Sequence, residues 1–389
     1  MIDIVREEAL RDSGVYPKRD LALVRGEGAR VWDDAGRRYI DCVSGIGSAN
    51  VGHAHPRVVA AIREQAGRLL VCPGVFSNDR RAELMRRLVE IAPAGIERIF
   101  LCNSGTESVE GAIKFARWRT GRAGVVACMR GFHGRTMGAL SATWEKDYRG
   151  PFEPLVPGFT HIPYDDLEAL TKAVDGTTAA VILEVVQGEG GVRPGSAAFL
   201  QGAQELCRGR GALLIIDEVQ SGVGRTGRMF ACEHHGLEPD LICVAKSIAG
   251  GLPMGAVLIG ERVGELPGKI HGSTLGGNPM ACAAAIATLD ILRDERLPER
   301  AARLGEHALE RLRRIEVPVV REARGLGLFL AVELKTRSAP FVRKLQEDGV
   351  LVLQAGPTVI RILPPLVIEE SDLDTVVDAI GSVLAAGAS

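Results

Sequence analysis

Short apolar runs that stop at polar residues constrain the fold of this chain more than any other feature of its sequence. Two of them, residues 212–216 and 241–245, do not alternate between apolar and polar side chains, which predicts strands buried on both faces of a parallel sheet. Three earlier runs also stop at polar residues and lie at 98–102, 124–129 and 179–183. Segments with helical spacing separate the runs. Strands that alternate with helices predict an α/β fold with a mostly parallel central sheet and helices on both faces.

The polar residues that follow these runs are the candidates for a functional site. The carboxyl ends of parallel strands meet at one edge of a sheet, and ligands bind outside that edge. Asp217 follows one run and Lys246 follows the next. A carboxylate and an amine at two strand ends suit a cofactor whose ring nitrogen needs a counter-ion and whose aldehyde needs an amine, which describes pyridoxal phosphate. Each residue alone is more commonly a surface lysine or a helix-capping aspartate, so the hypothesis depends on the convergence of several strand ends.

Other residues at the same edge suit other parts of such a cofactor. Ser104, Gly105 and Thr106 lie between a predicted strand and a predicted helix, where backbone N–H groups and two hydroxyls can form a phosphate site. The alternative for Ser104 is an ordinary helix N-cap. Phe132 and Val219 are candidates for the two faces of a planar ring, with ordinary core packing as the alternative.

Two further patterns lead to different expectations. The planar fork of Arg135 matches a substrate carboxylate bidentately, although a surface arginine is the commoner role. Residues 222–227 match G-x-G-x-x-G, but residues 217–221 separate this pattern from the preceding strand. A dinucleotide site needs its first glycine directly after the strand, so we interpret the pattern as a decoy.

Composition and charge argue against several other classes of protein. The net charge of -2 gives no support for nucleic acid as a main partner. The longest apolar stretch, 280–289, is too short to span a membrane, and the acidic N-terminus lacks an apolar signal core. The eight cysteines are scattered without a C-x-x-C pair, which is typical of buried side chains in a reducing compartment. We therefore expect a cytoplasmic protein without a metal site.

The length of 389 residues favours two domains. Residues 1–45 are expected to form an N-terminal arm that belongs to the smaller domain. Residues 46–278 would form the large α/β domain, and residues 279–389 a smaller α+β domain. In the last of these, Ser371 begins a capping-box pattern that predicts the start of the final helix.

Six motifs, taken together in this order and at these spacings, resemble the class III (ω-amino) pyridoxal-phosphate aminotransferases. The resemblance extends from about Tyr16 to Ala385. The motifs are N-S-G-T-E at 103–107, G-F-H-G-R-T at 131–136, Q-G-E-G-G at 187–191, D-E-V-Q at 217–220, A-K at 245–246 and H-G-S-T-L-G-G-N-P at 271–279. The resemblance implies fold type I of the pyridoxal-phosphate-dependent transferases and pyridoxal 5'-phosphate as the cofactor.

The same resemblance implies roles around the cofactor. Lys246 would carry it as a Schiff base and would then move a proton, and Asp217 would keep the ring nitrogen protonated. Gln220 would meet the phenolic oxygen, and Thr274 would reach the phosphate of the neighbouring subunit, so the active unit would be a homodimer. The remaining cofactor contacts would come from Ser104, Gly105 and Thr106 at the phosphate and from Phe132 and Val219 at the ring.

Substrate contacts are implied in the same way. Arg135 would bind the α-carboxylate of an acylated diamino acid or of 2-oxoglutarate. Glu189 and Arg361 resemble a gate that is closed for the amino donor and opens to free Arg361 for the second carboxylate of 2-oxoglutarate. Tyr16 and Ser273 are further expected substrate contacts.

Within the family, the chain is most similar to the N-acetylornithine aminotransferases, and especially to the branch that acts on acylated lysine. The expected reaction moves the terminal amino group of N-acetylornithine or of an acylated lysine to 2-oxoglutarate, giving the semialdehyde and glutamate, in arginine or lysine biosynthesis. The lysine could be held on an acidic amino-group carrier protein. Val185 and Ile46 depart from the pattern of the family, and Ile46 leaves the shape of the donor pocket open.

Three alternatives stay open from the sequence alone. The donor could be 4-aminobutyrate or free ornithine. The same fold could support an aminomutase, a racemase or a decarboxylation, but the pairing of Glu189 with Arg361 favours an enzyme with two substrates. A non-catalytic protein that has kept the fold would not need Lys246.

Overall fold

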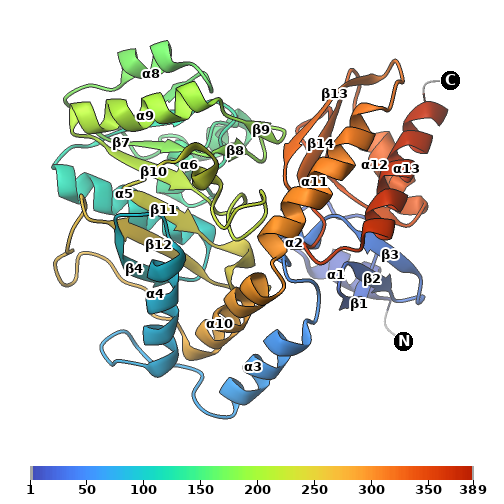
Figure 1. Ribbon diagram of the computed structural model, residues 1–389, viewed down its shortest axis with the longest axis horizontal. Coiled ribbons are helices and arrows are strands. Elements are labelled where there is room, and N and C mark those ends of the chain that lie inside the picture. The colour runs from blue at the N-terminus through green and yellow to red at the C-terminus, as the bar shows by residue number, and fades with distance from the viewer. Residues whose placement is uncertain (1–2, 388–389) are drawn as a thin grey trace.

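The computed structural model describes residues 3–387, and Figure 1 shows its arrangement. Within these residues the largest sheet has seven strands, in the order β4-β12-β11-β10-β7-β5-β6. Their bounds are β4 Ile96–Cys102, β5 Gly124–Cys128, β6 Phe159–Ile162, β7 Thr178–Leu183, β10 Leu213–Asp217, β11 Leu241–Val244 and β12 Gly255–Gly260. β12 runs antiparallel to both of its neighbours, whereas all other adjacent pairs are parallel. The carboxyl ends of the five predicted strands therefore meet at one edge.

Helices cover both faces of this sheet, as Figure 1 shows. On one face, α5 (Gly105–Thr120) and α6 (Met137–Ala142) pack against a buried set that includes Val125, Ala180 and Ile215. On the other face, α9 (Ala197–Arg210) packs against Val181 and Leu214. Because successive side chains of one strand enter different cores, every residue of β10 is buried. This explains why its sequence does not alternate.

The C-terminal part of the chain forms a second, antiparallel sheet in the order β13-β14-β17-β16. Its strands are β13 Val320–Leu326, β14 Phe329–Leu334, β16 Leu353–Ala355 and β17 Val359–Ile362, and the helices of this region are α11 Leu297–Arg313, α12 Ala339–Glu347 and α13 Glu370–Ala386. Leu304 and Ala308 of α11 join Phe329 and Leu330 of β14 in the main hydrophobic core. The amphipathic helix α11 thus packs against this second, antiparallel sheet.

A third sheet joins the two ends of the chain. Its strands are β1 Leu23–Glu27, β2 Arg30–Asp33, β3 Arg38–Asp41 and β15 Val350–Leu351, and β3 pairs in parallel with β15. We keep the division into residues 1–45, 46–278 and 279–389 as a proposal, and this pairing supports its assignment of the arm to the smaller domain.

The remaining elements are short segments and the helices that flank the sheets. They are α1 Ile4–Arg11, α2 Ser44–Gly47, α3 Pro56–Ala66, α4 Asp79–Ile91, α7 Lys146–Arg149, α8 Leu167–Ala173, α10 Pro279–Asp294, β8 Val186–Gln187, β9 Arg193–Pro194 and the 3₁₀ turns Gly150–Phe152, Ala231–His235 and Lys246–Ala249. No helix within residues 3–387 is both long and apolar enough to cross a membrane.

Two details differ from the expectations. The last helix begins at Glu370 after Glu369, so Ser371 lies inside its first turn and the capping-box prediction is wrong. Glu369 is extended at the cap position without a side-chain cap bond, and no local sequence rule identifies such a start. Of the eight cysteines, seven are buried as expected, but Cys72 is partly exposed.

The loop with the G-x-G-x-x-G pattern connects the large sheet to the C-terminal region. Arg225 is completely buried, and its guanidinium donates to the carbonyl oxygens of Leu328 at 3.0 Å and Pro364 at 2.5 Å and to Asn50 Oδ1 at 2.5 Å. Burial lowers the pKa of Arg225 to about 9. The structure therefore gives this loop a packing role.

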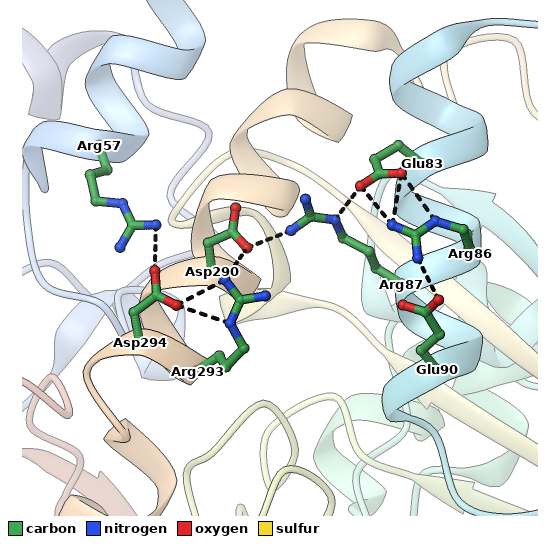
Figure 2. A network of polar contacts seen from close by, with 8 residues as sticks. All are labelled: Arg57, Glu83, Arg86, Arg87, Glu90, Asp290, Arg293 and Asp294. Atoms are coloured by element: carbon green, nitrogen blue, oxygen red, sulfur yellow. Dashed lines mark hydrogen bonds and ion pairs between the residues drawn. The ribbon is translucent and has the colours of Figure 1, made fainter.

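A chain of ion pairs links three helices at the surface (Figure 2). Arg57 of α3 contacts Asp294 of α10 at 2.9 Å, and Arg87 of α4 contacts Asp290 of α10 at 2.5 Å. Arg293 contacts both of these aspartates. Exposed pairs such as Arg57–Asp294 contribute about 0–1 kcal/mol each, so they add little to the stability of the fold.

Candidate active site

A cavity of about 280 Å³ lies at the carboxyl edge of the large sheet, and we call it the inner cavity. Residues that follow β4, β5, β7, β10 and β11 line it: Gly105, Thr106, Phe132, His133, Gly134, Arg135, Glu184, Glu189, Asp217, Val219, Gln220 and Lys246. Nine of these twelve were predicted site residues. A larger cavity of about 860 Å³ lies between α4, α10 and α11, but none of the predicted site residues lines it. The inner cavity is therefore the candidate active site.

Lys246 lies two residues after the end of the buried strand β11. β11 ends at Val244, Ala245 is extended, and Lys246 begins a 3₁₀ turn with φ of 40°. Its side chain borders the inner cavity. Burial lowers the pKa of the Lys246 amine, although the negative charge of Asp217 opposes this. A lowered pKa favours the unprotonated amine, which is the form that can act as a nucleophile or a base.

Asp217 is the last residue of β10 and is held at both carboxylate oxygens. Oδ1 accepts a hydrogen bond from the Val219 N–H at 3.0 Å, and Oδ2 lies 2.8 Å from His133 Nδ1. Both Asp217 and His133 are at most 5 % exposed. Burial alone would lower the pKa of His133, but the hydrogen bond to Asp217 and the negative charges of Asp217 and Glu184 together outweigh burial and raise that pKa. The contact therefore fixes the orientation of the buried Asp217 carboxylate.

Glu184 follows β7 and lies in the same buried region. It accepts hydrogen bonds from the N–H groups of Phe132 and Gly188, both at 3.0 Å. Burial raises the pKa of Glu184 to about 7. A carboxyl whose pKa is raised by burial therefore lies beside the Asp217–His133 pair.

The start of α5 forms another wall of the inner cavity. Ser104 is the N-cap of this helix, and its Oγ accepts a hydrogen bond from the Glu107 N–H at 3.3 Å. Thr106 Oγ1 lies 2.7 Å from Thr136 Oγ1. A Cβ at Gly105 would lie 2.6 Å from Val219 Cγ1, so only glycine lets the helix start approach this valine so closely. Gly105 and Thr106 line the cavity, whereas Ser104 lies behind them.

Arg135 and Arg361 place two guanidinium groups near the cavity. The Arg135 guanidinium carbon lies 3.4 Å from the ring centre of Tyr148 and 5.6 Å from that of Phe132. Arg361 Nη1 lies 2.6 Å from Glu189 Oε1 and 3.3 Å from Gln220 Oε1. Arg361 is only 3 % exposed, and its buried Nε has no hydrogen-bond partner. The structure therefore pairs Arg361 with Glu189, while the role of this pair as a gate stays a prediction.

Comparison with known proteins identifies the family of the chain. The family model Aminotransferase class-III matches residues 14–384.

This chain is a class III aminotransferase.

The chain is 52% identical over 377 residues to the [LysW]-aminoadipate semialdehyde transaminase of Deinococcus radiodurans, covering 96% of this chain and 88% of the relative. It is 50% identical over 375 residues to the acetylornithine aminotransferase of Methanopyrus kandleri, covering 95% and 96%. Among solved structures, ornithine aminotransferase from Toxoplasma gondii superposes with a TM-score of 0.94 at 38% identity, covering 99% of this chain and 95% of that one. The protein is thus a pyridoxal-phosphate-dependent transaminase.

The inner cavity of this aminotransferase has the parts that the cofactor needs. An amine at Lys246, a carboxylate at Asp217 and the first turn of α5 all border one space. A Cβ on Gly134 would lie 2.3 Å from Thr106 Oγ1, so a glycine is needed where this loop meets the helix start. The residues present therefore fit pyridoxal phosphate.

Five predicted residues do not line the inner cavity of this aminotransferase: Ser104 and Arg361, described above, and Thr274, Tyr16 and Ser273. Thr274 is exposed, and Tyr16 is 72% exposed. Ser273 Oγ instead accepts hydrogen bonds from Asn103 Nδ2 at 3.0 Å and from the Gly276 N–H at 3.1 Å. The roles of these residues stay predictions, and that of Thr274 requires a second subunit.

Sequence reasoning missed four residues of the aminotransferase site, one of which is Gly134 on the lining of the inner cavity. His133 contacts Asp217, which is 84 residues away, and Tyr148 contacts Arg135, which is 13 residues away. Glu184 had a usable signal, since it follows a predicted buried strand. Neither a ring contact nor a buried hydrogen bond between distant segments leaves a periodic trace in the sequence.

Proposed function

We propose that this transaminase moves the terminal amino group of N-acetylornithine or of an acylated lysine to 2-oxoglutarate, giving the semialdehyde and glutamate. The observation that carries the proposal is the presence of Arg135 and of the Glu189–Arg361 pair beside Lys246 and Asp217. The names of the two similar relatives support this class of donor and a place in arginine or lysine biosynthesis. A cytoplasmic location agrees with such a biosynthetic role.

The residues around the cofactor are assigned as part of this proposal. Lys246 would hold it covalently, and Asp217 would pair with the ring nitrogen, oriented by His133. Gln220 would meet the phenolic oxygen. The other contacts would be Ser104, Gly105 and Thr106 at the phosphate and Phe132 and Val219 on the two faces of the ring. When bound, pyridoxal phosphate supplies the electron sink for the charge left when a proton leaves the substrate carbon.

The protein groups then position the substrates and move the proton. The Arg135 guanidinium would bind the α-carboxylate, which orients the terminal amine toward Lys246. Lys246 Nζ, once free, would take the proton from the substrate carbon and deliver it as an acid, since its lowered pKa suits both steps. In the second half-reaction Glu189 would move away, and Arg361 would bind the distal carboxylate of 2-oxoglutarate. Tyr16 and Ser273 are kept as proposed substrate contacts.

We include a homodimer in the proposal. Five large apolar side chains are 45–85 % exposed in the segment between α3 and α4: Leu69, Leu70, Val71, Val75 and Phe76. Arg81 ties this segment to the loop that carries Thr274, since its side chain donates to the carbonyl oxygens of Phe76 at 3.0 Å and Gly277 at 3.1 Å. Such a group of exposed apolar residues marks a protein interface. A second copy of the chain on this surface would bring Thr274 to the partner's site, and an acidic carrier protein remains a proposed donor partner.

A half-reaction tests the proposal directly. Purified yellow protein is mixed with N-acetylornithine, N-acetyl-lysine, ornithine or 4-aminobutyrate without a 2-oxo acid, and its visible spectrum is recorded. We expect the acylated diamino acids to bleach the cofactor band and 2-oxoglutarate to restore it, while Lys246→Ala gives no turnover. Bleaching by 4-aminobutyrate or free ornithine alone would overturn the donor. A mutase or racemase would convert its substrate without net use of 2-oxoglutarate.

A further inference from the structure

A second cavity of about 450 Å³ adjoins the inner cavity, and we call it the outer cavity. Phe132 and Glu189 line both cavities. Tyr148 lines the outer cavity and has the Arg135 guanidinium over its ring at 3.4 Å. In an acylated diamino acid the acyl group is attached next to the α-carboxylate. A donor held by Arg135 therefore has its acyl group at the boundary between the two cavities.

Three arginines converge on the outer cavity. Arg130, Arg193 and Arg321 all line it. Their main acidic neighbour is Glu333, a buried carboxylate that lies 2.6 Å from Arg193, 3.5 Å from Arg321 and 2.6 Å from Arg324. A second carboxylate, Glu322, pairs with Arg324 and lies 4.0 Å from Arg193, and neither carboxylate contacts Arg130. Glu145, also on the lining, is exposed and accepts the Asp147 N–H at 3.4 Å, so it does not pair with these arginines.

Part of the positive charge that lines this cavity has no acidic or hydrogen-bonding partner among the described residues. Among residues 3–387, Arg130 has neither an ion pair nor a side-chain hydrogen bond, and the buried Arg193 Nε has no hydrogen-bond partner. Burial lowers the pKa of Arg193, and the charges of Arg324 and Arg130 lower it further, although the carboxylates of Glu333 and Glu322 act in the opposite direction. Like charges held together at the mouth of a site favour an anionic ligand.

We propose that the outer cavity is an anion subsite, formed by Arg130, Arg193 and Arg321, for a carboxylate on the acyl group of the amino donor. This inference rests on the proposed function and narrows its donor class. A neutral acetyl group leaves the three arginines to water, whereas an acyl group that ends in a carboxylate contacts them. The enzyme therefore prefers a donor with an anionic acyl group.

The test compares two donors that differ in this charge. N²-succinyl-ornithine and N²-butyryl-ornithine have acyl chains of similar length, and kcat/KM is measured for each with 2-oxoglutarate. We expect the succinyl donor to be favoured at least about tenfold, because hydrogen bonds to charged groups contribute more than neutral ones. The ratio should fall toward one in the double variant Arg130→Gln/Arg321→Gln. Arg314→Gln, which removes one charge at an exposed position of α11's C-cap, should keep the native ratio.

Unreactive analogues make the test independent of turnover. N²-succinyl-norvaline and N²-butyryl-norvaline lack the terminal amine, and their affinities for the holoenzyme are measured by titration calorimetry. Tighter binding of the succinyl compound, lost in the double variant but not in Arg314→Gln, would support the subsite. Equal affinities in the native enzyme, or a preference that survives in the double variant, would overturn it. Failure of every acylated donor to react would refute the proposed function, while the analogues would still decide on the subsite.

Discussion

At the scale of single residues, Gly105 shows how a missing side chain shapes the site. A Cβ there would lie 2.6 Å and 3.1 Å from the two methyl carbons of Val219, so an added methyl displaces this valine or the start of α5. Both elements border the space proposed for the cofactor. The N-S-G-T-E motif thus requires glycine at this position for steric reasons.

We predict that Gly105→Ala weakens cofactor binding about tenfold, which corresponds to about 1.4 kcal/mol. The apoprotein is titrated with pyridoxal phosphate, and the dissociation constant is measured by absorbance. Gly209→Ala is the control, because a Cβ at this position in α9 meets no atom within 4 Å. An unchanged dissociation constant in Gly105→Ala would contradict the steric argument.

Glu218 provides a residue-scale prediction for the effect of pH. It is 1% exposed, accepts hydrogen bonds from Ser221 Oγ at 2.7 Å and from the Cys232 N–H at 2.8 Å, and burial raises its pKa from 4.5 to about 7. The folded state therefore holds a proton that the unfolded chain releases near pH 4.5. The stabilisation is fully present below about pH 4.5 and is lost as the pH rises through about 7, an effect of about 3 kcal/mol.

The variant Glu218→Gln should lose this pH dependence. The free energy of unfolding is measured by denaturant titration at pH 5 and pH 8 in both proteins. The native protein should lose about 2.5 kcal/mol more than the variant between these pH values. Glu184 also has a pKa of about 7, but it is present in both proteins and cancels in the difference. Equal losses would show that Glu218 does not hold the proton.

At the scale of secondary-structure elements, most strands of the large sheet could be predicted, but their order in the sheet could not. The five strands that carry the site were predicted from apolar runs and turn residues. β12, which lies between β11 and β4 and runs the other way, was not predicted, because strand order depends on contacts between distant segments. The five carboxyl ends still converge, since β12 is antiparallel to both neighbours and leaves β4 parallel to β11.

Arg225 gives the element-scale prediction, since it connects the loop after β10 to the C-terminal region. Replacing it with methionine leaves Leu328 O, Pro364 O and Asn50 Oδ1 buried without their donor. We expect Arg225→Met to lower the free energy of unfolding by about 2–4 kcal/mol. Denaturant titration measures this loss, and Arg314→Met is the control because the side chain of Arg314 is 78% exposed. Similar stabilities of the two variants would contradict a structural role for Arg225.

At the scale of the whole molecule, the exposed apolar segment between α3 and α4 is the basis for predicting how the protein assembles. Val75 is 85% and Phe76 is 65% exposed, and the segment is bonded through Arg81 to the loop that contains Thr274. Burial of such side chains against a second copy would remove apolar surface from water. Assembly and cofactor binding should therefore be linked.

We predict that Val75→Glu/Phe76→Glu yields a monomer with weakened cofactor binding. Light scattering coupled to size exclusion gives the mass of each protein, with a dimer expected for the native chain, and absorbance titration gives its affinity for pyridoxal phosphate. Phe152→Glu is the control, because Phe152 is 56% exposed in a different segment. A native monomer, or a double variant that remains dimeric, would refute the proposed interface.

Local patterns of apolar and polar residues were enough to predict the strands of the site and the polar residues at their carboxyl ends. Asp217 is the last residue of a buried strand and Lys246 lies two residues after the end of another, and this local pattern brings both to one sheet edge. Only the tertiary structure decided which side chains face them. The contact of Asp217 with His133 spans 84 residues, and Arg193 meets Arg321 and Arg324 of β13 at Glu333 of β14. Such contacts depend on how the strands are ordered and packed, which local periodicity does not encode.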